Sequence, residues 1–288
     1  MSEQPPAPVA ASPAGVQAAP GIDLNADLGE SLSGQPTADD PALLDIVTSA
    51  NIACGFHAGE PGDLLRTLER AAAAGVTVGA HPSYRDRAGF GRRSLDASPE
   101  ELEAEVIYQL GALAALAERA GTRVSYVKPH GALYNRIVHD EKQARAVVKA
   151  VAAFDRSLPL LLLPGSAAGR LATQCGLSTV TEAFADRAYQ PDGTLVPRSR
   201  ADAVIHDPAE VIERTVRLFT TGRMRAADGT EFELRAQSLC VHGDTLGAVE
   251  LARALREGLA DAGIAVRPFA GLNATPHPQA EPPQAACR

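Results

Sequence analysis

Ionisable side chains recur along this chain directly after short apolar segments. Five of the seven histidines lie in or near such positions, together with carboxylates, amides and one of only three lysines. Histidine beside carboxylate is typical of general acid–base catalysis and of metal binding. We therefore predict one reactive site assembled from several segments. Its candidate residues are Asn25, Asp27, Glu30, Asn51, His57, His81, Lys128, His130, Asn135, Glu182, Arg187, His242 and Asp244.

Two kinds of chemistry fit this set, and both lead to hydrolysis of an amide or ester. Without a metal, Asp27 or Asp244 would act as the base for water, while Lys128 and a histidine stabilise negative charge on a carbonyl oxygen. With a metal, Asp27, His57 and His81 would supply oxygen and nitrogen ligands, with His130 or His242 as a further candidate. No H-x-x-x-H spacing supports the metal, and both alternatives stay open.

The segment SYVKPHGALYN, residues 125–135, ends an apolar run with Lys128 and His130. Residues two apart on a strand point to the same side, so we expect both side chains to face one site. Each polar residue alone could have a structural role: Asp27 or Asp244 could cap a helix, and Lys128 could extend to solvent. Polar groups at equivalent places on five or six segments are not explained this way, because a buried charge is costly unless it is paired or used.

Short apolar runs alternate with stretches of helical period, which predicts parallel strands joined by helical crossovers. In IDLNADLGE, Asp23, Asn25 and Asp27 share one face of the expected strand, and apolar residues share the other. A sheet buried on both faces rarely tolerates such a polar row, whereas a barrel with a site at its mouth requires one. We therefore predict an α/β fold, a (β/α) barrel of about seven parallel strands, with an open doubly wound sheet as the alternative. The expected strands span residues 22–28, 49–55, 76–82, 124–130, 159–164, 178–185 and 237–244, and the clearest helices span 61–75, 98–121 and 140–154.

Two segments interrupt this alternation, and each carries an Asp-Gly turn between extended stretches. Residues 186–199 follow the carboxyl end of a strand, so we expect them to cover the site. Residues 223–236 precede the last strand, and we expect them to lie on the opposite side of the barrel.

Composition limits the class of protein. The chain is 45% hydrophobic and 22% charged, and its formal net charge of −8 argues against nucleic acid or an anionic membrane as the main partner. Residues 1–20 and 274–288 are rich in Pro and Ala, which predicts disordered tails around a single barrel domain over residues 21–273. The first of these segments lacks the basic and apolar regions of an export signal, so we expect a cytoplasmic protein.

Six motifs occur along the chain in the order DLNADLGES, ANIACGFHAG, GAHPSYRDRAGFGRR, KPHGALYN, EAFADRAYQPDGTLVPRS and CVHGD. Together they make the chain resemble the LamB/YcsF family of lactam-utilisation proteins, to which 5-oxoprolinase A subunits belong. The resemblance covers about residues 22–267, and one departure is Glu60, where the family usually has Asp.

The resemblance implies a barrel of the glycoside hydrolase/deacetylase type and ATP-dependent opening of 5-oxo-L-proline (pyroglutamate) to L-glutamate. It also implies partner subunits B and C, with ATP and Mg²⁺ as co-substrate, which is consistent with the lack of a P-loop motif in this sequence. The alternatives are a metal-dependent deacetylase or carbohydrate hydrolase of the same fold, and a non-catalytic substrate-binding subunit.

The resemblance also suggests roles. Asp27 would orient or deprotonate water, with His57 and His81 nearby as ligands or proton carriers. Lys128 and His130 would face the carbonyl oxygen or its phosphate. The substrate carboxylate would be held by a bidentate arginine, Arg187 or Arg198. The other candidates for substrate contact are Asn25, Glu30, Asn51, Asn135, Glu182 and His242.

Overall fold

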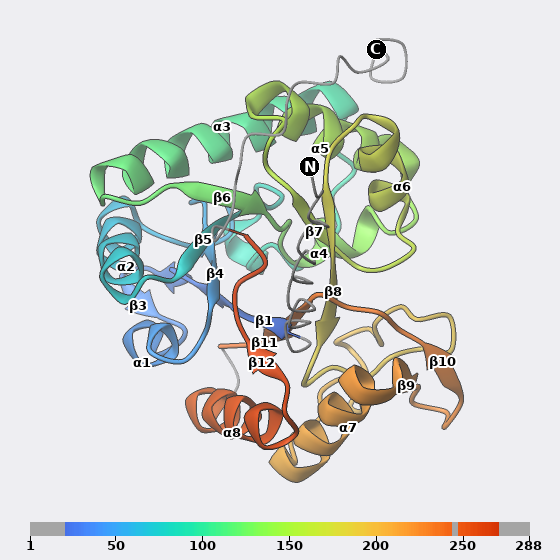
Figure 1. Ribbon diagram of the computed structural model, residues 1–288. Helices are drawn as coiled ribbons and strands as arrows, with labels where there is room; N and C mark the ends of the chain where they lie inside the picture. The colour runs from blue at the N-terminus through green and yellow to red at the C-terminus, as the bar shows by residue number, and fades with distance from the viewer. Residues whose placement is uncertain (1–20, 244–246, 271–288) are drawn as a thin grey trace, which may run out of the picture.

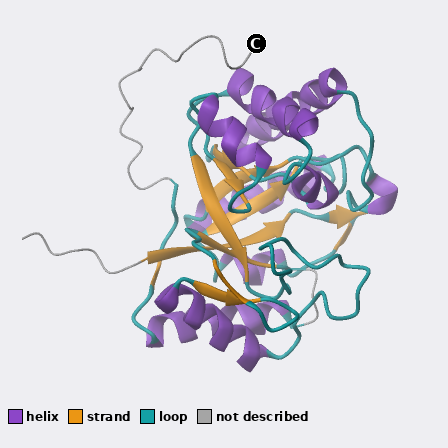
Figure 2. Ribbon diagram, turned by 90° about the vertical axis from the view of Figure 1, so that its right-hand side faces the viewer, coloured by secondary structure: helices purple, strands orange, loops and turns teal. Residues whose placement is uncertain are grey.

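Seven parallel strands close into a barrel with helices around its outside (Figures 1 and 2). The computed structural model describes residues 21–243 and 247–270, so both predicted tails lie outside the described residues. Strand β11 pairs with β1, which completes the ring and excludes the open doubly wound sheet. The predicted (β/α) barrel is confirmed. In ring order the strands are β1 (Gly21–Leu28), β4 (Ser49–Ala53), β5 (Thr77–His81), β6 (Val124–Val127), β7 (Leu160–Leu162), β8 (Thr179–Phe184) and β11 (Ser238–Val241).

The crossover helices begin and end where the sequence supplies suitable residues. Ser98 precedes α3 and its hydroxyl accepts the backbone N–H of Glu101 at 3.2 Å, and Asp140 caps α5 in the same way. Pro61 opens α2, and Gly75 ends it with a φ of 68°, which glycine adopts without strain. The helices are α1 (Asp40–Leu44), α2 (Pro61–Ala74), α3 (Pro99–Arg119), α4 (Gly131–Arg136), α5 (Glu141–Phe154), α6 (Ala167–Gln174), α7 (Pro208–Thr221) and α8 (Ala248–Asp261), with a 3₁₀ turn at Arg87–Gly89.

Polar side chains fill much of the barrel interior, where aliphatic layers are usual in this architecture. Asp23 accepts hydrogen bonds from the hydroxyls of Ser49, at 2.6 Å, and Ser238. One layer higher, the Asn25 amide donates to Glu182 Oε1 at 3.0 Å and to Ser238 Oγ at 2.7 Å. The alternation along β1 therefore places its polar row inside the barrel, as predicted, and its aliphatic row against the helices.

Segment 186–199 and the hairpin β9 (Arg223–Arg225) and β10 (Glu231–Glu233) pack against each other. The ring centroids of Tyr189 and Phe232 lie 5.8 Å apart, and the backbone N–H of Ala227 donates to the Tyr189 carbonyl at 2.8 Å. The predicted hairpin is confirmed, but its expected position opposite the first insert was wrong, because it supports that insert. The hairpin β2 (Ser31–Leu32) and β3 (Gln35–Pro36) was not predicted, and neither was the strand β12 (Ala265–Val266), which pairs with the start of β1.

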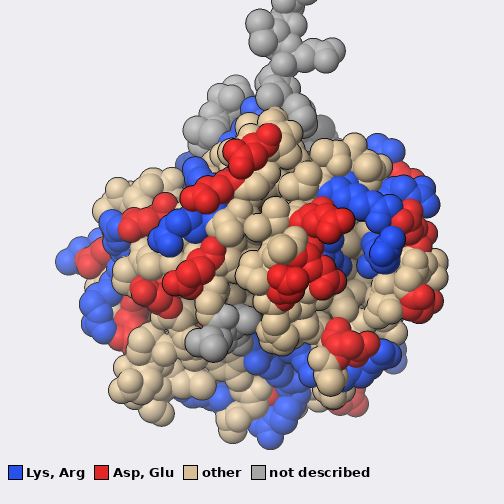
Figure 3. Space-filling model, turned by 90° about the horizontal axis from the view of Figure 1, so that it is seen from below, with Lys and Arg blue, Asp and Glu red and all other residues tan. Residues whose placement is uncertain are grey.

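The surface carries charges of both signs. Figure 3 shows acidic and basic side chains interspersed over the face seen from below in Figure 1. Many of them form exposed ion pairs, such as Arg217 with Glu231 and Arg200 with Asp202, and each such pair adds little stability. Within the described ranges, no helix combines the length and apolar character needed to cross a membrane.

Candidate active site

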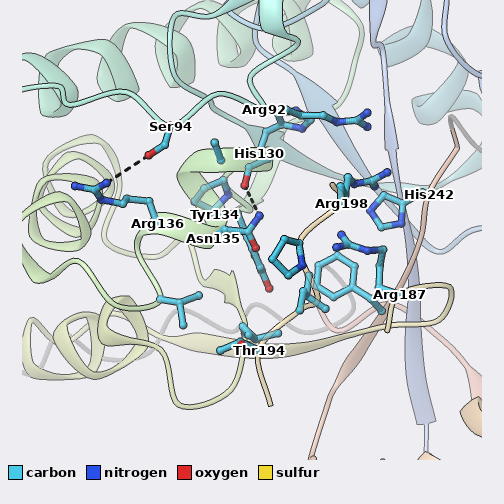
Figure 4. Close-up of a pocket in the computed structure, with 18 of the residues that line it drawn as sticks. Arg92, Ser94, His130, Tyr134, Asn135, Arg136, Arg187, Thr194, Arg198 and His242 are labelled. Atoms are coloured by element: carbon cyan, nitrogen blue, oxygen red, sulfur yellow. Dashed lines mark hydrogen bonds between the residues drawn. The ribbon is translucent and has the colours of Figure 1, made fainter. Parts of the chain in front are cut away.

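A pocket of about 770 Å³ opens at the carboxyl ends of the barrel strands. Asp27, His81, Lys128 and His130 line its floor, and α4 and segment 186–199 form much of its walls (Figure 4). The prediction that segment 186–199 covers the site is confirmed, since Gln190 and residues 194–199 line the pocket. This is the end of a parallel barrel at which loops build active sites.

Lys128 lies at the centre of the floor and is buried between two carboxylates. Its Nζ is 3.1 Å from Asp27 Oδ1, 2.9 Å from Glu182 Oε1 and 3.2 Å from Asn25 Oδ1. These three oxygens account for the three N–H donors of an ammonium group. Lys128 therefore interacts with the barrel interior and holds Asp27 in place, rather than presenting a donor to the pocket.

The two groups of this ion pair stabilise each other's charged form. Burial alone would raise the pKa of Asp27, but His81 and Lys128 hold it well below its usual range. Burial alone would lower the pKa of Lys128, but Asp27 and Glu182 help to raise it well above its usual range. A carboxylate that stays ionised at the floor of a pocket can orient water or a positively charged group.

Three histidines and Glu30 form a cluster beside this ion pair. The rings of His57 and His130 stack at a centroid distance of 3.8 Å, and His130 Nδ1 lies 3.0 Å from His81 Nε2. Glu30 Oε1 is 3.1 Å from His57 Nε2 and 3.3 Å from His130 Nδ1. Burial holds the pKa of His57 well below its usual range, with a further contribution from His81. Burial lowers the pKa of His130 in the same way, with a further contribution from His57. Both rings are therefore neutral near pH 7.

Four of these side chains could hold a metal ion. The ligand atoms of Asp27, Glu30, His81 and His130 all lie within 4.8 Å of one another. This group differs from the predicted set of Asp27, His57 and His81, because it takes Glu30 and His130 in place of His57. The Nδ1 of His57 instead lies 2.9 Å from the Ser83 hydroxyl, and its ring packs behind the cluster against His130.

His242 and Asp186 form a second reactive pair close to Asp27. His242 Nδ1 lies 2.8 Å from Asp186 Oδ1, and the other ring edge faces the pocket that His242 lines. Asp186 is buried, which opposes its charge, but His242 lowers its pKa below the usual value. A carboxylate that holds one imidazole nitrogen and leaves the other to the substrate is the arrangement of a general acid–base group.

Arginines line the pocket: in the view of Figure 4, Arg92, Arg187 and Arg198 lie on the side of His242, and Arg136 lies on the other side. Arg187 is buried, and its guanidinium donates to the Ala203 carbonyl at 3.1 Å and to the Val196 carbonyl at 2.6 Å, so it holds segment 186–199 in place. Burial, together with Arg198, lowers the pKa of Arg187 to about 10. Arg198 lies on segment 186–199 itself and lines the pocket, as does Arg92. Of the two predicted carboxylate clamps, Arg198 therefore has the better position.

Most of the predicted site residues lie in or next to the pocket, but several of them do not line it directly. Asn25 and Glu182 lie one layer below the pocket, and Asn51 donates to Asp27 Oδ1 at 2.8 Å without lining the pocket. Asn135 lines the pocket and donates to the Gly131 carbonyl at 3.0 Å. Asp244 lies outside the described residues, so its predicted role stays a prediction.

Asp186 is the residue that sequence reasoning left without a role. The register of β8 and β11 pairs Glu182 with Ser238 and Phe184 with Cys240, and continuing it by two residues places Asp186 beside His242. The carboxylate at the end of the segment TEAFAD was therefore a usable signal, provided that the neighbouring strand was known. Ser83, Tyr126 and Cys240, which contact His57, Asn51 and Lys128, carried no comparable signal.

Comparison with known proteins gives matches over nearly the whole described chain. The model of the LamB/YcsF family matches residues 22–274. A protein of Kocuria rhizophila, named as the A subunit of 5-oxoprolinase, is 59% identical over 249 residues, which are 86% of this chain and 99% of that protein. A protein of Pseudomonas syringae pv. tomato, also named as an A subunit of 5-oxoprolinase, is 56% identical over 250 residues, which are 87% of this chain and 98% of that protein.

Solved structures match in the same region. The crystal structure of a lactam utilization protein from Thermus thermophilus superposes with a TM-score of 0.82 and 47% identity, over 86% of this chain and all of that one. A putative cellobiose-phosphate cleavage protein of Enterococcus faecalis superposes with a TM-score of 0.51 at 14% identity, over 86% of this chain and 97% of that one. The second likeness shows the barrel fold alone.

Proposed function

The chain belongs to the LamB/YcsF family, and we propose that it acts as the A subunit of an ATP-dependent 5-oxoprolinase. In this proposal it opens the lactam ring of 5-oxo-L-proline to give L-glutamate, together with partner subunits B and C. Relatives that are named as A subunits of 5-oxoprolinase align with it over nearly their full length. The observation that carries the proposal is the pocket floor, where ionised Asp27 lies between the buried Lys128 and the His242–Asp186 pair.

The chemistry explains why ATP is required. A five-membered lactam is a stable amide, and transfer of the γ-phosphoryl group to its carbonyl oxygen makes the ring carbon far more electrophilic. Water then adds to that carbon, the ring C–N bond breaks as the nitrogen takes up a proton, and a second water releases phosphate from the resulting acyl phosphate. The sum is 5-oxoproline, ATP and two waters giving glutamate, ADP and phosphate. We assign the phosphoryl transfer to a reaction that needs the partners, and the binding and opening of the activated lactam to this chain.

The pocket offers a group for each later step. Asp27, fixed by Lys128 and Asn51, would orient the attacking water at the floor. His242, oriented by Asp186, would accept a proton from that water and return it to the ring nitrogen. Arg198 and Arg92 would hold the substrate carboxylate and the phosphate at the part of the pocket wall that they line. Lys128 acts on the reaction through Asp27, because its own donors are directed to oxygens of the barrel interior.

The size of the pocket agrees with a substrate larger than the free lactam. At about 770 Å³ it lies in the upper part of the range of small-molecule sites, which is roughly 300–1,000 Å³. A single five-membered ring with one carboxylate would leave most of this space to water. The phosphorylated lactam, or the lactam with a segment of one of the partners, would fill more of it.

Reconstitution tests the proposal. The chain is assayed for ATP- and 5-oxoproline-dependent glutamate release, alone and with the B and C subunits. We expect no turnover alone and turnover with both partners, in a 1:1 ratio of ADP to glutamate. Full turnover by this chain alone would contradict the shared mechanism.

The alternative of a non-catalytic binding subunit is separated by one variant in the same assay. We expect Asp186→Asn to assemble with the partners and bind substrate while glutamate release falls. Unchanged release by a correctly assembled Asp186→Asn enzyme would favour the binding subunit.

A further inference from the structure

Two histidine nitrogens at the pocket floor face each other, and the hydrogen-bond partners of the two rings indicate which nitrogen of each ring carries the hydrogen in the neutral tautomer. His81 Nδ1 lies 2.6 Å from the backbone carbonyl oxygen of Lys128, and His130 Nε2 lies 2.9 Å from that of Phe90. A carbonyl oxygen only accepts, so these two nitrogens carry the ring hydrogens. The remaining nitrogens, His81 Nε2 and His130 Nδ1, point their lone pairs at each other across 3.0 Å. Two such lone pairs repel unless a cation lies between them.

Two carboxylate oxygens complete this arrangement. Glu30 Oε1 lies 3.3 Å from His130 Nδ1, and Asp27 Oδ2 lies 3.4 Å from His81 Nε2. All four donors line the pocket and are largely buried, with Asp27 the most exposed at 12%. One nitrogen of each ring and one oxygen of each carboxylate therefore converge on one largely buried point, and this set of donors suits a divalent transition-metal ion.

The distances favour a metal ion over a shared proton. A proton on one of the two nitrogens would account for their own separation of 3.0 Å, but not for the convergence of two carboxylate oxygens at 3.3 and 3.4 Å. Donors placed about 2.0–2.1 Å from a tetrahedral ion lie about 3.3 Å from one another. The three measured separations of 3.0, 3.3 and 3.4 Å are close to that value.

The surroundings of the four donors are those of a metal site. Each histidine fixes its tautomer by donating its other N–H to a backbone carbonyl, which is the usual outer contact of a metal-binding imidazole. Asp27 uses Oδ1 for Lys128 and Asn51, and keeps Oδ2 directed at His81. The open side faces the pocket, so a fifth position is accessible to a small ligand.

We propose that His81, His130, Glu30 and Asp27 bind one divalent first-row transition-metal ion. Two nitrogens with two carboxylate oxygens suit Zn²⁺, Mn²⁺, Fe²⁺ or Co²⁺, whereas Mg²⁺ and Ca²⁺ prefer oxygen alone. The ion is separate from the Mg²⁺ that accompanies ATP. It lies next to the water position that we assign to Asp27.

Metal binding by the full chain, without an affinity tag, tests this site directly. The protein is stripped with a chelator and titrated with Co²⁺, whose visible absorption reports coordination number, and Zn²⁺ is then used to displace the Co²⁺. We expect one saturable site per chain, with a band typical of four- or five-coordinate Co²⁺. Zn²⁺ should also raise the midpoint of thermal unfolding of the wild type.

Matched variants locate the site. We expect His81→Ala and His130→Ala each to weaken Co²⁺ binding at least about 100-fold, and Glu30→Gln to weaken it about 10–100-fold. His139→Ala is the control, because His139 lines the same pocket but lies outside the group of four. Circular dichroism of each stripped variant checks that the barrel is intact.

The proposal is overturned if the folded wild type binds none of Co²⁺, Zn²⁺ and Mn²⁺ stoichiometrically. It is equally overturned if His81→Ala and His130→Ala bind Co²⁺ as the wild type does. The titration uses no ATP, 5-oxoproline or partner protein. Failure of metal binding therefore leaves the proposed oxoprolinase function standing, and an inactive reconstituted enzyme leaves the metal site standing.

Discussion

Replacing Lys128 by Met should be among the most destabilising single changes in this barrel. The ammonium is 2% exposed and pairs with Asp27 and Glu182, whose side chains are 12% and 0% exposed. Met nearly conserves the length of the side chain, and removes the charge, its N–H donors and the contact of the ammonium with the Phe184 ring. Removal of one partner from a buried ion pair costs about 3–5 kcal/mol, and here two carboxylates lose their cation.

The loss is large compared with the total stability of a folded domain, which is about 5–15 kcal/mol. We expect Lys128→Met to lower the free energy of unfolding by about 4–5 kcal/mol. Urea unfolding followed by circular dichroism measures this loss, with the m-values compared between variants. Lys142→Met is the matched control, because Lys142 is exposed on α5, and its stability should stay within about 0.5 kcal/mol of the wild type.

A second substitution separates lost charge pairing from lost packing. Glu182→Gln keeps an oxygen to accept from Asn25 and removes one of the two unpaired charges. The double variant Lys128→Met/Glu182→Gln should therefore recover about 2–3 kcal/mol relative to Lys128→Met alone. Additive losses in the double variant, or a Lys128→Met protein within about 1 kcal/mol of the wild type, would refute the role of Lys128 as the counter-ion of this floor.

Three further predictions follow from the site and its supports. Asp186→Asn should lower kcat for glutamate release by about 10²–10⁴-fold in the reconstituted enzyme with KM little changed, because His242 loses the carboxylate that orients it. An equal change in KM would instead indicate that Asp186 acts in substrate binding. Burial raises the pKa of Asp23 to about 6, so the folded state holds its proton more tightly than the unfolded state, and wild-type stability falls as pH rises from about 4 to about 6. The stability of Asp23→Asn relative to the wild type should then increase by about 2 kcal/mol between pH 4 and 7 in urea titrations, and a constant difference would contradict this. Arg187→Met removes the guanidinium donor from the Val196 carbonyl and leaves the Ala203 carbonyl with the backbone N–H of Ala188. It should destabilise the protein by about 1–3 kcal/mol and accelerate amide hydrogen exchange in residues 186–205, and unchanged exchange there would exclude Arg187 as the residue that holds this segment in place.

The local sequence pattern was sufficient to predict the strands and the polar row of β1. The alternation of Asp23, Asn25 and Asp27 with aliphatic residues required one polar and one apolar environment, and barrel closure provides both. Boundaries were less accurate where the pattern continued past the strand. The predicted strand 124–130 ends at Val127, because Pro129 has no N–H for the ladder and Gly131 starts α4. Lys128 and His130 nevertheless both reach the pocket floor, as their spacing suggested.

Contacts between side chains of distant strands could not be predicted from the sequence, because they depend on the register of the strands and on closure of the ring. Lys128 meets Glu182 across the barrel, and nothing in the spacing of the two residues encodes that contact. The group of four side chains that could hold a metal differs from the predicted set at His57 for a similar reason. All the histidines of the cluster follow strands, but ring orientation, set by the carbonyls of Lys128 and Phe90, decides which nitrogens face Asp27 and Glu30.

The central claim is that Asp27 at the floor of this pocket takes part in opening the lactam ring. Its most direct test is the rate of glutamate release by the Asp27→Asn chain assembled with the B and C subunits, with ATP and 5-oxoproline both saturating. Loss of a carboxylate that orients the reacting water should lower that rate by at least about 100-fold while the complex still assembles. Near-normal release of glutamate by the assembled Asp27→Asn enzyme would contradict the account.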